Sequence, residues 1–91
     1  MITENNLRLD NKTIVVTGAS GYIGSSISSS LSMLGADLIL VDIDKEKLSK
    51  LSNNIKNQNP ANIKIIKADL SKPKDVLKIL KYIMDNKLVI N

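Results

Sequence analysis

Three glycines stand close together between an apolar segment and a segment of helical period. They are Gly18, Gly21 and Gly24, in the sequence Thr-Gly-Ala-Ser-Gly-Tyr-Ile-Gly of residues 17–24. Gly18 allows a sharp turn out of a strand, because glycine adopts positive φ without a Cβ penalty. Gly21 leaves the backbone bare for a pyrophosphate, and Gly24 lets the next helix pack closely on the strand. A turn that ends at the free N–H groups of a helix predicts a phosphate-binding site, with a plain tight turn as the alternative.

An aspartate ends the second apolar segment. Asp42 lies 24 residues after Gly18 and 18 residues after Gly24. An acidic side chain about 20 residues beyond such a glycine motif can accept hydrogen bonds from the hydroxyls of an adenosine ribose. Its alternative role is to cap a helix, but Asp44 is better placed for that. We therefore interpret Asp42 as a ribose ligand, which favours NAD over NADP, because the extra phosphate of NADP would be repelled.

The composition excludes several classes of site. The 91 residues include no cysteine and no histidine, so no disulfide, thiolate or imidazole metal site is expected. The net charge is +4, but the lysines are scattered and the only aromatic residues are Tyr22 and Tyr82, so we expect no nucleic-acid partner. No apolar run approaches the ~20 residues of a membrane span, and residues 1–6 do not resemble a signal peptide. A cytoplasmic location is the resulting expectation.

Apolar β-branched segments alternate with segments of helical period along the whole chain. This order is typical of βαβ units around a parallel sheet. Strands are predicted over residues 13–17, 38–41 and 63–68, and a fourth begins at 88–90. We expect residues 1–91 to form one α/β domain with a three-layer, Rossmann-type parallel sheet in the order 3-2-1, in which the fourth strand is truncated.

Each predicted helix has its own apolar face and boundary residues. The first ends at Gly35, the second begins with Asp44 as its cap, and the third is capped by Ser71 with Pro73 in its first turn. The three apolar faces are Ile23, Ile27, Leu31 and Leu34; then Leu48, Leu51 and Ile55; then Val76, Leu77, Leu80, Ile83 and Met84.

These landmarks together resemble the short-chain dehydrogenase/reductase family. Residues 9–18 look like the family's entry into its first strand, residues 17–24 resemble its glycine motif, and Asp42 matches its acidic residue after the second strand. Asp69-Leu70-Ser71 resembles a further family motif whose carboxylate contacts the adenine amino group, although a loop aspartate near a helix start would look the same. The resemblance implies an NAD(P)-binding Rossmann domain. Its expected cofactor-binding residues are Gly18, Ser20, Gly21, Tyr22, Ile23, Gly24, Asp42, Ile43, Asp69 and Leu70.

The chain departs from the family pattern in two ways. Its T-G-x-x-G-x-x-G spacing is typical of the extended branch of nucleotide-sugar epimerases and dehydratases, whereas its long second helix and the Asp69 motif favour the shorter, single-domain branch. The family's catalytic serine and Tyr-x-x-x-Lys pair would lie beyond Asn91. Tyr82 and Lys87 are spaced by five, not four, so no catalytic residue is predicted.

The family resemblance implies an oxidoreductase that transfers hydride between NAD and an alcohol or carbonyl, with this chain as the cofactor-binding half. A small-molecule substrate is expected only in a longer form of the protein. An epimerase or dehydratase and a non-catalytic nucleotide-binding module are the alternatives. In the family order the fourth strand pairs with the first, so a first strand with an open edge also predicts self-association.

Overall fold

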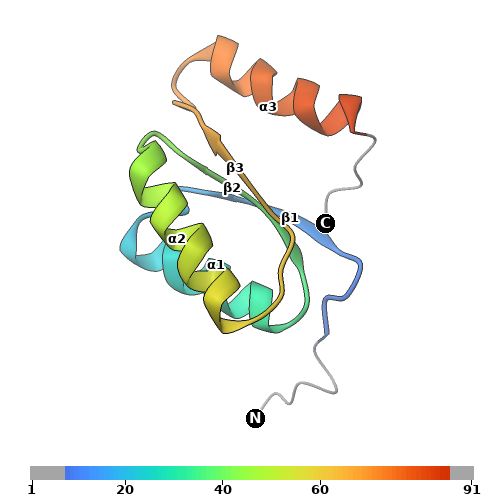
Figure 1. Cartoon of the computed structure of the whole chain (residues 1–91). Coiled ribbons are helices and arrows are strands. Elements are labelled where there is room, and N and C mark those ends of the chain that lie inside the picture. The colour runs from blue at the N-terminus through green and yellow to red at the C-terminus, as the bar shows by residue number, and fades with distance from the viewer. Residues whose placement is uncertain (1–7, 87–91) are drawn as a thin grey trace.

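Three parallel strands form the centre of the computed structural model, which describes residues 8–86 (Figure 1). The elements in chain order are β1 (Thr13–Thr17), α1 (Tyr22–Met33), β2 (Asp37–Asp42), α2 (Lys45–Gln58), β3 (Ile63–Lys67) and α3 (Pro73–Asp85). The strand order is β1-β2-β3, which confirms the predicted order. The predicted fourth strand at 88–90 lies outside the described residues.

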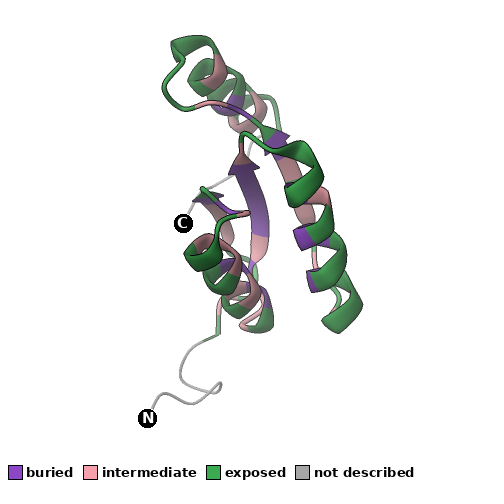
Figure 2. Cartoon of the chain, turned by 90° about the vertical axis from the view of Figure 1, so that its left-hand side faces the viewer, coloured by how far each residue is buried: buried purple, intermediate pink, exposed green. Residues whose placement is uncertain are grey.

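The central position of β2 in the sheet explains why its sequence is apolar without alternation. Its side chains are buried on both faces of the sheet, as expected for a parallel strand between two helical layers (Figure 2). Leu38 and Leu40 join the cluster under α1 and α2, whereas Ile39 and Val41 join the cluster under α3. The sheet therefore has a helical layer on each face, and the three-layer α/β fold is confirmed (Figure 1).

Helix α1 follows the predicted apolar face only in its second half, where Leu31 packs against the core. Ile23 and Ile27 are 71% and 48% exposed, while Ser28 and Ser32 are buried. The Ser28 hydroxyl donates to a main-chain carbonyl one turn earlier (2.7 Å), and the Ser32 hydroxyl accepts from the Asn59 side-chain amide (2.9 Å). The expected apolar face was wrong in its first half, because small side chains fill the side that approaches the sheet most closely.

Helix α2 follows the sequence prediction. The Asp44 side chain caps its start by accepting from the Lys47 main-chain N–H at 3.1 Å. Leu48, Leu51 and Ile55 are buried, as their spacing predicted.

Helix α3 differs from the prediction at its start and in its apolar face. Lys72 is the N-cap and makes no side-chain cap bond, whereas the Ser71 hydroxyl donates to Asp69; Pro73 is in the first turn, as predicted. Ile79 is the buried residue of the helix. Of the predicted apolar face, Ile83 packs against the core, whereas four members are exposed: Val76, Leu77, Leu80 and Met84.

Candidate functional site

The turns that follow the three strands meet at one edge of the sheet. In a parallel sheet all strands end at the same edge, which is where open α/β folds bind their ligands. The Ala19 N–H donates to the Val41 carbonyl (3.1 Å), and the Ala68 N–H donates to the Asp42 carbonyl (2.9 Å). These two hydrogen bonds hold the glycine turn, the end of β2 and the end of β3 side by side.

The glycine turn is compact and leaves no room for a side chain at its last glycine. Gly18 has a φ of +63°, a left-handed conformation that glycine adopts without a Cβ penalty, as its place in the motif predicted. The Gly21 N–H donates to the Gly18 carbonyl at 3.2 Å. A Cβ at Gly24 would lie 2.1 Å from that same carbonyl oxygen. Helix α1 therefore starts directly against the backbone of the turn.

The start of α1 presents main-chain donors without a competing acid. Its N-cap is Gly21, which makes no side-chain cap bond, and its first turn contains no acidic residue. The first intrahelical hydrogen bond runs from the Ser25 N–H to the Gly21 carbonyl (2.9 Å), so the N–H groups of residues 22–24 precede it. Tyr22 and Ile23 are largely exposed. This end of the helix carries the positive end of its dipole and suits an anion.

Asp42 reaches across from β2 to the glycine turn. Its Oδ2 accepts from the Ser20 N–H (3.0 Å) and from the Ser20 hydroxyl (2.6 Å), and its Oδ1 accepts from the Ile43 N–H (2.8 Å). The Ser20 hydroxyl is the main cause that lowers the pKa of Asp42; burial opposes it, and Lys47 adds a small lowering effect. The side chain is thus an ionised acceptor beside the glycine turn.

Asp69 lies in the third turn, after β3. Its Oδ1 accepts from the main-chain N–H (2.9 Å) and the hydroxyl (2.6 Å) of Ser71, and these bonds lower the pKa of Asp69. A cavity of about 290 Å³ lies between this turn and Ile43. Ile43 and Leu70 are 55% and 46% exposed. The two turns therefore offer apolar side chains next to a carboxylate.

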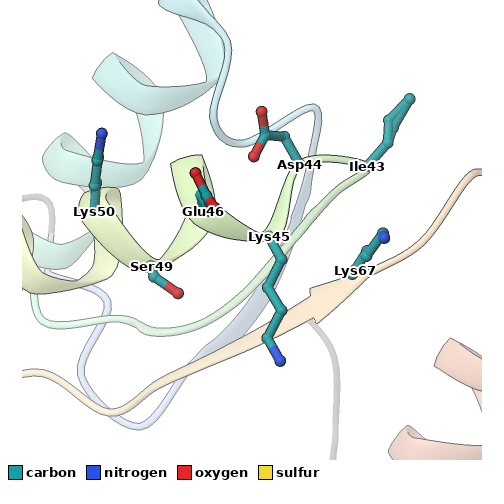
Figure 3. A pocket seen from close by; sticks show the side chains of 7 residues that line it. All are labelled: Ile43, Asp44, Lys45, Glu46, Ser49, Lys50 and Lys67. Carbon is teal, nitrogen blue, oxygen red and sulfur yellow. The ribbon is translucent and has the colours of Figure 1, made fainter.

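A second hollow, of about 960 Å³, adjoins Ile43 on the side of α2 and β3. Figure 3 shows Lys45 at the start of α2 and Lys67 at the end of β3, with Asp44 leaving the chain on the side opposite to Lys45. No motif in the sequence predicted that these two lysines lie together. Both follow or end a strand at the carboxyl edge of the sheet, and that position in the sequence could have predicted that they lie together.

Metal and membrane sites receive no support in the part of the chain that the structure describes. Residues 8–86 contain no group of three potential metal-ligating side chains. Within the same range, no helix is long and apolar enough to cross a membrane.

The family of the chain follows from its similarity to known proteins. The sequence model described as short chain dehydrogenase matches residues 12–90. The chain belongs to the short-chain dehydrogenase family. An uncharacterised oxidoreductase of Staphylococcus epidermidis is 32% identical to this short-chain dehydrogenase chain over 79 residues, which cover 87% of the chain and 33% of that relative.

Solved structures of the family have the same fold. A citronellol catabolism dehydrogenase of Pseudomonas aeruginosa PAO1 superposes with a TM-score of 0.86 at 27% identity, over 93% of this chain and 35% of that one. A metagenomic short-chain oxidoreductase solved in complex with NADP superposes with a TM-score of 0.79 at 29% identity, over 86% and 35%. This short-chain dehydrogenase chain thus spans about a third of the length of each of these three proteins.

Proposed function

We propose that this chain binds NAD at the carboxyl edge of its sheet and forms the cofactor-binding part of an NAD-dependent oxidoreductase. The observation that carries the proposal is the position of Asp42, whose carboxylate lies 3.0 Å from the main-chain nitrogen of Ser20 in the glycine turn. A ribose acceptor and an anion site are thereby joined in one place, which is the arrangement that a dinucleotide requires.

Each part of the dinucleotide has residues of matching chemistry. The N–H groups at the start of α1 would hold the pyrophosphate, and Gly21 would leave space for it. Asp42 would accept from a ribose hydroxyl. Ile43 and Leu70 would contact the adenine, and Asp69 would accept from its amino group, as the family motif implies. Gly18, Ser20, Tyr22, Ile23 and Gly24 would complete the site by shaping the turn.

NAD would supply the hydride-transfer chemistry when bound. Within residues 8–86, no side chain is assigned to catalysis. We propose that an alcohol or carbonyl substrate is engaged only in a longer form of the protein, because relatives are about three times longer. A cytoplasmic location and self-association stay predictions.

The preference for NAD over NADP is part of the proposal. A phosphate on the ribose oxygen would bring about −1.5 to −2 charges close to the Asp42 carboxylate. Two unit charges 4 Å apart repel by about 4 kcal/mol at an effective dielectric of 20, and solvent and salt reduce this to ~1–3 kcal/mol. Lys45 and Lys67 line the hollow beside Ile43 and oppose the preference. The metagenomic neighbour was solved with NADP and a putative D-mannonate oxidoreductase of the same fold with NAD, so the fold accommodates either cofactor.

Titration calorimetry of the 91-residue chain with NAD and NADP tests the proposal. We expect NAD to bind about 5- to 150-fold more tightly than NADP. Asp42→Ala should weaken NAD binding and so reduce the ratio of NAD affinity to NADP affinity. Asp37→Ala is the matched control, because Asp37 is the first residue of β2 and Asp42 is the last. Equal or tighter binding of NADP by the unaltered chain would show that Asp42 does not hold the ribose.

A further inference from the structure

A hydrogen bond between two side chains joins two turns of the site. Ser20 in the glycine turn and Asp42 at the end of β2 are 22 residues apart in the sequence. The main-chain N–H and the hydroxyl of Ser20 both donate to the same carboxylate oxygen, Oδ2, at 3.0 and 2.6 Å. A neutral turn serine thus contacts the carboxylate that is proposed to hold the ribose.

The contact with Ser20 leaves only part of the Asp42 carboxylate free to accept further hydrogen bonds. A carboxylate has about four acceptor positions, two on each oxygen. The two Ser20 donors fill those of Oδ2, and the Ile43 N–H takes one position on Oδ1 at 2.8 Å. One acceptor position remains, on Oδ1. Ser20 therefore selects which oxygen of Asp42 can receive a further donor.

We infer that the Ser20 hydroxyl is the positioning group for Asp42: it holds Oδ2 against the glycine turn, presents Oδ1 to a ribose hydroxyl, and thereby sets the preference for NAD over NADP. This inference rests on the proposed function and adds the residue that determines its cofactor specificity. Ser20 acts through the direction of the carboxylate rather than through its charge, because an aspartate is ionised at neutral pH with or without the serine.

Two variants of the full 91-residue chain separate this role from a general effect on the turn. Ser20→Ala removes the hydroxyl and keeps the main-chain donor, whereas Ser20→Thr keeps both. We expect Ser20→Ala to bind NAD about 3- to 20-fold more weakly, since a hydrogen bond to a charged group is lost while two main-chain donors remain. NADP affinity should change much less, so the NAD/NADP ratio falls. Ser20→Thr should keep the ratio of the unaltered chain.

Ser25→Ala is the matched control. Its hydroxyl lies close to the glycine turn, in the first turn of α1, but it donates to the Tyr22 carbonyl at 3.0 Å and not to Asp42. The second readout is the carboxyl-carbon NMR titration of Asp42. We expect Ser20→Ala to raise the pKa of Asp42, because the hydroxyl is the main cause of its lowering, and Ser25→Ala to leave it unchanged.

The outcomes distinguish the inference from the function on which it rests. A raised Asp42 pKa in Ser20→Ala with an unchanged NAD/NADP ratio would overturn the positioning role and leave the proposed function standing. If Ser20→Ala does not fold, a Ser20→Thr chain that keeps the low pKa but loses the cofactor preference would overturn it as well. If the unaltered chain bound no NAD, the proposed function would fail, and this inference with it.

Discussion

Replacing Gly24 by alanine is the sharpest test of how the glycine turn and α1 fit together. The new Cβ would lie 2.1 Å from the Gly18 carbonyl oxygen, 2.9 Å from its carbon and 3.0 Å from the Ala19 Cα. All three are backbone atoms, and ordinary van der Waals contact begins at 3.4 Å. The start of α1 would therefore have to move away from the turn by more than an ångström.

That movement should lower the free energy of unfolding of the Gly24→Ala chain. Overpacking a tight contact costs about 1–3 kcal/mol, and the absence of any flexible side chain places Gly24→Ala at the upper end. Alanine recovers about 0.4–1 kcal/mol by restricting the unfolded chain. We therefore expect a loss of about 2 kcal/mol in the free energy of unfolding. For a chain of this size that corresponds to a decrease in Tm of about 10 °C.

Gly21→Ala is the matched variant. Gly21 has an extended backbone, with φ −73° and ψ 173°, and a Cβ there would meet the Gly18 carbonyl oxygen only at 3.4 Å. We expect its stability to stay within about 0.5 kcal/mol of the unaltered chain. Its NAD affinity should nevertheless fall, because the Cβ occupies the side from which the pyrophosphate is proposed to approach.

Thermal unfolding followed by circular dichroism, together with NAD calorimetry at low temperature, measures both effects. Gly24→Ala should lose stability and binding, whereas Gly21→Ala should lose binding alone. A Gly24→Ala chain as stable as the unaltered one would refute the close approach of α1 to the turn. An equal loss of stability in both variants would refute the distinction between the two glycines.

Three further results are expected. The pKa values of Asp42 and Asp69 are lowered in the folded chain, so the stability they add is present above the unfolded value of 3.8 and is lost as the pH falls through the folded values. The urea midpoint should therefore decrease from pH 6 to pH 3, and Asp42→Asn should reduce that decrease; an identical decrease in the variant would contradict the assignment. The 91-residue chain should show no steady NADH production with simple alcohols, and turnover above a no-protein control would overturn this. Because β1 is an edge strand of the described sheet, size-exclusion chromatography should show self-association; a sharp monomer peak with slow amide exchange at residues 14–16 would refute it.

Features that depend on a few neighbouring residues were predicted well. The first strand, residues 13–17, was predicted with its observed bounds, and the second differs by one residue at each end. Asp44 caps α2 as expected. Each of these depends on local chemistry: a short apolar run between turn residues, or an acid next to free N–H groups.

Features that depend on contact between elements were predicted poorly. The spacing of Ile23 and Ile27 indicated a buried face for α1, but Gly24 brings the helix so close to the turn that Ser28 and Ser32 occupy the buried side instead. Leu80 and Met84 were expected on the buried face of α3, yet both are exposed and Ile79 is buried instead. Periodicity identifies which residues share a helical face, but not which of two adjacent faces meets the sheet.

The sequence by itself determined the α/β class, the parallel strand order and the family, because these follow from apolar runs, their spacing and the glycine motif. Only the tertiary structure decided that Ser20 donates to Asp42 and that Lys45 and Lys67 share one hollow beside Ile43. Such contacts join residues that are distant in the chain. They form because parallel pairing places the ends of β1, β2 and β3 at one edge of the sheet, and no local pattern specifies which side chains then face one another.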